Sequence, residues 1–107
     1  MKLITKDELK NKLDNKEDFK LVMVLGEWQF KAMHIPTSIH IDNIETGKRL
    51  LNKDDEIVVY CANVNCVASV YAYQLLEKND FTNVKRYAGG VEDWEAAGYP
   101  LEGELAD

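Results

Sequence analysis

Short apolar runs alternate with segments of helical periodicity along this chain. A continuous apolar run or a strict apolar–polar alternation is typical of a strand, whereas apolar residues at i, i+4 and i+8 indicate a helix. The expected strands are residues 20–25, 38–41, 56–60 and 83–87, and the expected helices are residues 5–13, 27–33, 43–51, 66–78 and 91–97.

The segment 66–78 gives the clearest helical signal. Its apolar stripe consists of Val67, Ala68, Tyr71, Ala72, Leu75 and Leu76. The helix at 5–13 has a capping-box start, with Thr5 followed three residues later by Glu8. Strands that alternate with helices predict βαβ units, a mostly parallel sheet and helices on both of its faces.

Length and composition limit the possible classes of protein. A chain of 107 residues, 46% of them hydrophobic, fits a single domain over residues 1–107, with an acidic tail at 102–107 that we expect to be frayed. The net charge of −6 argues against nucleic acid or an anionic membrane as the main partner. The first residues lack the long apolar region of a signal peptide, so we expect a cytoplasmic location and reduced cysteines.

Both cysteines of the chain lie in one short segment. The apolar run at 57–60 ends on Cys61, a polar loop follows at 62–65, and the expected helix begins near Cys66. A strand end that faces a helix start is a place where backbone N–H groups converge, and these stabilise a thiolate or an anionic persulfide. Cys61 is therefore the candidate nucleophile, and the alternative is a cysteine buried for packing alone.

Cys66 is the possible second thiol. It fits either a resolving thiol that forms a disulfide or a small residue in the first helical turn, and we favour the second role because many loops of this size hold two sulfurs too far apart. The cysteines with His34 and His40 nominally match zinc spacings, but their order is reversed and Pro36 separates the histidines. We expect no metal and no cofactor, and a structural role for His34 at its turn.

Several motifs together resemble those of a known family. They are Leu21-Val22 with Phe30 and His34-Ile35-Pro36, the run from Ile57 to Cys61, Asn83-Val84 with Gly89-Gly90-Val91 and Trp94, and Ala97-Gly98-Tyr99-Pro100-Leu101. In this order the chain resembles the single-domain rhodanese (sulfurtransferase) family over about residues 4–103. The resemblance implies a three-layer α/β/α domain with a central parallel sheet of about five strands.

The resemblance also implies a reaction and its site. Cys61 would accept a sulfane sulfur from thiosulfate, a polysulfide or a persulfide, hold it as a persulfide and pass it to a thiol-type acceptor. The partners would be small sulfur compounds or persulfidated protein thiols. The substrate-binding loop would consist of Ala62, Asn63, Val64, Asn65, Cys66 and Val67.

The chain departs from the family pattern at three places. Met23 and Leu25 stand where an Asp and an Arg are common, and the loop from Cys61 to Ser69 is two residues longer than usual and contains neither Gly nor Arg. A phosphatase or arsenate reductase needs Arg six residues after the cysteine to bind a dianion, and Val67 occupies that position. These departures weaken the case for thiosulfate. Arg86 is a possible source of charge, although a surface role for it is the simpler interpretation.

Two alternatives remain open beside sulfur transfer. A rhodanese-like module that only binds is suggested by the apolar residues at 23 and 25 and by the loop without arginine. A dithiol redox protein is suggested by the two cysteines in one loop.

Overall fold

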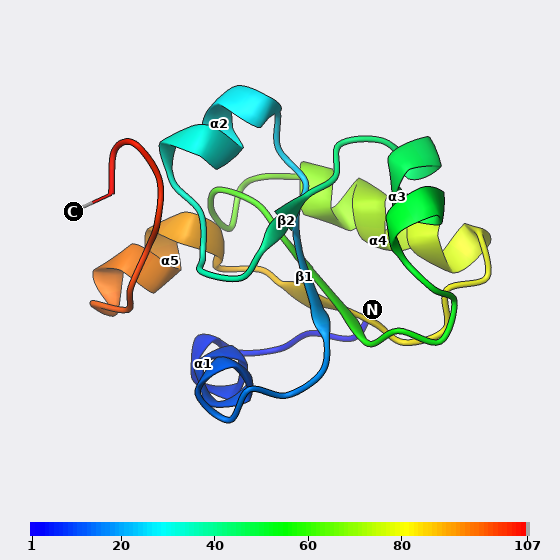
Figure 1. Ribbon diagram of the computed structural model, residues 1–107, viewed down its shortest axis with the longest axis horizontal. Helices are drawn as coiled ribbons and strands as arrows, with labels where there is room; N and C mark the ends of the chain where they lie inside the picture. The colour runs from blue at the N-terminus through cyan, green and yellow to red at the C-terminus, as the bar shows by residue number, and fades with distance from the viewer. Residues whose placement is uncertain (107) are drawn as a thin grey trace.

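A parallel four-stranded sheet forms the centre of the molecule in the computed structural model, which describes residues 1–106 (Figure 1). The strands lie in the order β2-β1-β3-β4. They are β1 (Lys20–Met23), β2 (Ile39–His40), β3 (Ile57–Tyr60) and β4 (Val84–Tyr87). The helices are α1 (Lys6–Asp14), α2 (Glu27–Ala32), α3 (Ile44–Leu50), α4 (Ala68–Lys78) and α5 (Gly90–Ala96).

Helices cover both faces of this sheet and produce two apolar clusters. One face packs α1 and α5 against the sheet through Leu9, Tyr60 and Trp94. The opposite face packs α3 and α4 through residues such as Val59 and Leu76. All four residues of β3 are buried, because alternate side chains enter the two clusters. The predicted α/β/α architecture is therefore confirmed.

The sheet has four strands among the described residues, as the apolar pattern predicts, rather than the five that the family resemblance implies. The segment before α1 contributes only an isolated parallel bridge between Leu3 and Arg86. It cannot extend into a strand because the Thr5 side chain accepts a hydrogen bond from the Glu8 backbone at 3.1 Å and begins α1.

The helix expected from residue 66 begins two residues later, at Ala68. Asn63 explains the delay, because its side-chain oxygen accepts the N–H of Asn65 at 3.0 Å and its carbonyl accepts the N–H of Cys66 at 3.1 Å. These bonds form a local turn that competes with the helix.

The acidic segment at 102–106 packs against His34 and the end of α2. His34 and Glu102 exchange two backbone hydrogen bonds of 2.8 and 2.9 Å, and the Leu105 N–H donates to the Ala32 carbonyl at 2.9 Å. The segment thereby closes over the end of α2. Asp107 lies outside the described residues.

The two tryptophans differ in their surroundings. Trp94 is completely buried and donates its indole N–H to the Pro100 carbonyl at 2.8 Å. Trp28 on α2, in contrast, is 75% exposed. The six-residue helix α2 buries none of its residues, because it borders the sheet rather than covering its centre.

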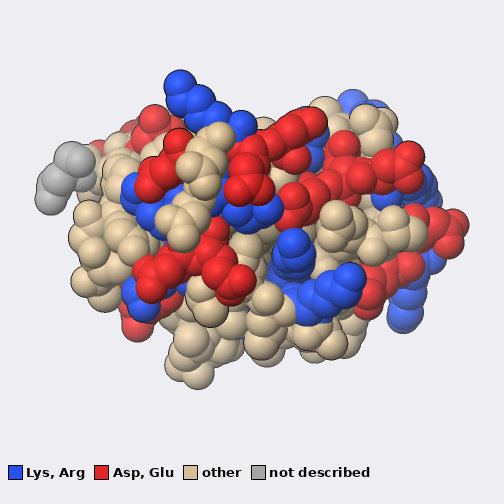
Figure 2. All heavy atoms as spheres, turned by 90° about the horizontal axis from the view of Figure 1, so that it is seen from below, with Lys and Arg blue, Asp and Glu red and all other residues tan. Residues whose placement is uncertain are grey.

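Charged side chains cover the exterior in mixed fashion. On the side where α1 lies, acidic and basic residues are interspersed (Figure 2). Lys10 pairs with Asp14 at 2.6 Å, and Glu56 pairs with both Lys12 and Lys85 at 2.8 Å. Among residues 1–106, the helices are all too short or too polar to cross a membrane.

Tyr60, the last residue of β3, connects this strand to the turn at 34–38. Its hydroxyl accepts the N–H of Ile35 at 3.0 Å and lies 2.9 Å from the Ser38 hydroxyl. Ser38 donates its hydroxyl proton to the Ile35 carbonyl at 2.6 Å. In the contact between the two hydroxyls, Tyr60 is therefore the donor and Ser38 the acceptor. Burial raises the pKa of Tyr60 to about 12, so the phenol is neutral at physiological pH.

Gly90 brings the start of α5 against the end of β3. The N–H groups of Val91 and Glu92 donate to the carbonyls of Cys61 and Ala62 at 3.0 and 2.9 Å. Gly90 has a φ of +67°, and an added Cβ would overlap the Cys61 carbonyl oxygen and lie 2.8 Å from the Ala62 carbonyl carbon. Only glycine permits this approach without displacement of the backbone that follows Cys61.

Replacement of Tyr60 by Phe should lower the free energy of unfolding by about 1–3 kcal/mol, because the buried Ile35 N–H loses its acceptor. Denaturant unfolding measures the loss. The pKa of Tyr60 is raised by folding, so its contribution is present below about pH 10 and is lost as pH rises through about 12. The difference between wild type and Tyr60→Phe should shrink over that range, and a difference constant with pH would contradict this assignment.

Gly90→Ala should destabilise the protein more than Gly98→Ala does. Both glycines have positive φ, which costs an alanine about 1–3 kcal/mol, but Gly98 has open space around its Cβ position whereas Gly90 faces the backbone of Cys61 and Ala62. Urea unfolding of the two variants isolates the cost of the contact. Equal losses would show that the approach of α5 to Cys61 is not tight.

Candidate functional site

Cys61 lies at the carboxyl end of the central strand β3, where parallel sheets commonly place their ligand sites. It is only 2% exposed. Its position continues the alternation of Ile57 and Val59, so it lies on the sheet face that α4 covers. The hydrogen bond from α5 to its carbonyl fixes the backbone at this point. The sequence-based location of the candidate nucleophile at a strand end is confirmed.

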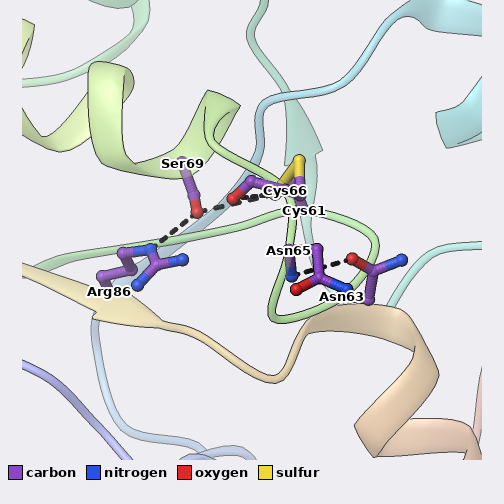
Figure 3. Close-up of a disulfide and its surroundings, with 6 residues drawn as sticks. All are labelled: Cys61, Asn63, Asn65, Cys66, Ser69 and Arg86. Carbon is purple, nitrogen blue, oxygen red and sulfur yellow. Dashed lines mark hydrogen bonds between the residues drawn. A yellow bond between two sulfur atoms is a disulfide. The ribbon is translucent and has the colours of Figure 1, made fainter.

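A disulfide joins Cys61 to Cys66 (Figure 3). The Cα atoms are 6.5 Å apart, within the range that disulfides span. The expectation that such a loop keeps the sulfurs apart is therefore wrong. The Asn63 turn supplies the reason, because it folds the loop back and brings Cys66 beside the strand end.

Two N–H groups of the loop at 62–67 are used within the loop itself. The N–H groups of Asn65 and Cys66 donate to Asn63, within the loop itself. Val64 and Val67 are 68% and 60% exposed. In the disulfide state, the N–H groups of Asn65 and Cys66 are therefore used for hydrogen bonds within the turn.

Ser69 and Arg86 lie beside the Cys61 sulfur. The Ser69 hydroxyl oxygen, in the first turn of α4, lies 3.5 Å from the Cys61 sulfur and is almost completely buried. Arg86 donates its Nε–H to the same oxygen at 2.8 Å (Figure 3). Because the Ser69 oxygen accepts the hydrogen bond from Arg86, the hydroxyl proton of Ser69 is available to be donated to the Cys61 sulfur.

Arg86 is therefore more than the surface residue that the sequence suggested. It is paired in register with Val59 of the neighbouring strand, so its side chain lies on the α4 face, as does Cys61. This position could have been read from the alternation of β4, in which Val84 and Arg86 share one face. The contact with Ser69 depends on the packing of α4, which that alternation does not specify.

Each of the two histidines places a ring nitrogen within hydrogen-bond distance of a backbone carbonyl oxygen. The His34 ring stacks on Phe30 with 4.1 Å between ring centres, and its Nδ1 lies 2.8 Å from the Phe30 carbonyl oxygen. The His40 Nε2 lies 2.6 Å from the Leu25 carbonyl oxygen. The structural role predicted for His34 is confirmed. Within the described part of the chain, no three His, Cys, Asp or Glu side chains gather as a metal site would require.

The arrangement supports thiol chemistry at one sulfur. In the reduced form, the Cys61 sulfur would lie beside the Ser69 hydroxyl, which the Arg86 guanidinium contacts, and such an arrangement can stabilise a thiolate. While the disulfide is intact, neither cysteine can attack a substrate.

Two curated proteins are similar to this chain in sequence. The thiosulfate sulfurtransferase GlpE of Pseudomonas syringae is 37% identical over 84 residues, which cover 77% of this chain and 76% of that protein. The HTH-type transcriptional regulator Rv0324 of Mycobacterium tuberculosis is 34% identical over 92% of this chain, and the chain spans only 44% of its length.

A solved structure shares the fold of this chain, and a family model matches most of its sequence. The BH2092 protein of Bacillus halodurans superimposes with a TM-score of 0.90 at 29% identity, over 98% of this chain and 79% of that one. The family model of the rhodanese-like domain matches residues 5–97. The chain belongs to the rhodanese-like domain family.

Proposed function

We propose that this domain is a sulfurtransferase that carries a sulfane sulfur as a persulfide on Cys61. The observation that carries the proposal is the position of Cys61 at the end of β3, beside a buried Ser69 that Arg86 polarises. The similarity to a thiosulfate sulfurtransferase supports the same class of reaction.

The reaction consists of two half-reactions. In the first, the Cys61 thiolate attacks the outer sulfur of a donor R–S–SH, the S–S bond breaks, and R–SH leaves with the proton. In the second, an acceptor thiolate attacks the outer sulfur of Cys61–S–S⁻ and restores the Cys61 thiolate. No net oxidation occurs, and ping-pong kinetics are expected.

Ser69 and Arg86 stabilise the charged form of the nucleophile. A Ser69 hydroxyl that accepts from a guanidinium is a better donor to sulfur than a free hydroxyl, since hydrogen bonds in series polarise one another. Arg86 thus replaces part of the charge that the loop lacks, from a neighbouring strand instead of the loop.

The surroundings favour a donor with little fixed negative charge. Met23 is buried and Leu25 packs against the apolar cluster on the α1 and α5 face, so neither contributes a polar contact to the site. A persulfide or polysulfide needs less positive charge than the thiosulfate dianion, which makes it the better matched donor.

A dithiol redox function is the second candidate, and the disulfide itself favours it. In that case the pair would exchange two electrons with a partner dithiol and no sulfur would be transferred. Mild oxidation would then be the only change that the two cysteines undergo, even when a sulfur donor is offered.

The reduced Cys66→Ser protein should gain the mass of one sulfur on Cys61 when it is exposed to glutathione persulfide, because Cys61 accepts the sulfur. The Cys61→Ser protein should gain none at this site. Intact-mass measurement followed by peptide mapping gives both results. Absence of added sulfur on Cys61 would contradict the proposal. It would favour a redox protein if mild oxidation still joins the two cysteines of the wild type, and a binding module if it does not.

Arg86→Met should slow alkylation of Cys61 in reduced Cys66→Ser protein by about threefold to tenfold at neutral pH, as expected from the loss of about 1 kcal/mol of thiolate stabilisation. Iodoacetamide labelling at several pH values measures the rate, and Arg86→Lys should give an intermediate value. Lys85→Met is the matched control, since Lys85 is the preceding residue of β4 and pairs with Glu56. Equal rates for Arg86→Met and Lys85→Met would contradict the role of Arg86.

A further inference from the structure

The position of Cys66 relative to Cys61 has a chemical consequence beyond transfer to an external acceptor. The loop allows the two sulfurs to bond directly, with Cα atoms 6.5 Å apart. Both belong to one short turn, so their effective concentration toward each other is high and no distant segment has to move. An external acceptor must diffuse to Cys61, whereas Cys66 is already beside it.

The two cysteines differ in how the fold holds them. Cys61 is fixed, because its side chain is 2% exposed and its carbonyl accepts a hydrogen bond from α5 at 3.0 Å. Cys66 is partly exposed and belongs to the Asn63 turn, whose residues Val64 and Asn65 are exposed. Because Cys61 is almost completely buried and its sulfur contacts the Cys66 carbonyl, access of a donor to that sulfur requires this turn to move.

We propose that Cys66 resolves the Cys61 persulfide and releases hydrosulfide, so that the domain reduces sulfane sulfur instead of only relaying it. This inference rests on the proposed persulfide at Cys61. The Cys66 sulfur attacks the inner sulfur of Cys61–S–S⁻, which is the atom it bonds in the structure. The Cys61–Cys66 bond forms, the bond to the outer sulfur breaks, and that sulfur leaves with the Cys66 proton as HS⁻.

Hydrosulfide is a favourable leaving group in this exchange, because a thiolate of a stronger acid leaves faster. The cycle closes when a partner dithiol reduces the Cys61–Cys66 disulfide and is itself oxidised to a disulfide. The sum is R–S–SH plus a dithiol giving R–SH, H₂S and a disulfide. The state with joined cysteines is then an intermediate of the cycle.

The test compares reduced wild type with Cys66→Ser and Cys66→Ala after a short exposure to glutathione persulfide and rapid removal of the donor. Wild type should lose two hydrogens and release one equivalent of hydrosulfide without added reductant. Both variants should instead keep one additional sulfur on Cys61 and release it only when a thiol is added. Wild type incubated without donor gives the background of air oxidation, and thermal unfolding checks that the variants are folded.

Three results would overturn the inference, and they separate it from the proposed function. If wild type keeps the added sulfur as the variants do, persulfide formation stands and resolution by Cys66 is wrong. If wild type forms the disulfide without release of hydrosulfide, the cysteines are oxidised without sulfur transfer. If neither wild type nor the variants gain sulfur or release hydrosulfide, the proposed sulfurtransferase function fails together with the inference.

Discussion

Burial of β3 on both faces is the constraint on which the rest of the structure depends. Its four residues are inaccessible to solvent, so helices must cover the sheet on either side and the strand must occupy the centre. Apolar side chains alternate between the two clusters along Ile57–Tyr60, and the next residue in this sequence is Cys61. The candidate nucleophile Cys61 therefore directly follows a strand that is buried on both faces, and this burial fixes its position in the fold.

The neighbours of β3 define the site from three directions. Tyr60 connects the strand to the turn at 34–38, and Gly90 brings the N–H groups of α5 onto the carbonyls of Cys61 and Ala62. From the other face, α4 supplies Ser69 and β4 supplies Arg86. The fold thus fixes the Cys61 backbone through hydrogen bonds, while the loop at 62–67 lies at the surface, which is a common arrangement of scaffold and site.

The loop is the part of the site at which this chain departs from the family pattern. It lacks an arginine and has an added cysteine. Arg86 supplies a cation from the sheet, on the same face as Cys61, and Cys66 supplies a second sulfur. A charge placed on a strand acts through Ser69 rather than on the substrate directly, which suits a nucleophile that must ionise more than a site that must bind a dianion.

Local patterns in the sequence were sufficient to predict the α/β class, the four strands and the location of Cys61 at a strand end. The reason is that a period of two residues in a strand, or of 3.6 residues in a helix, indicates which face is buried. The Thr5 capping box is likewise a local signal, and it was predicted correctly. Local patterns did not reveal that α4 begins at Ala68, that Cys66 bonds to Cys61, or that Arg86 reaches Ser69. The first depends on competition between the Asn63 turn and the helix. The other two depend on distances between side chains brought together by folding, and a sequence spacing does not contain those distances.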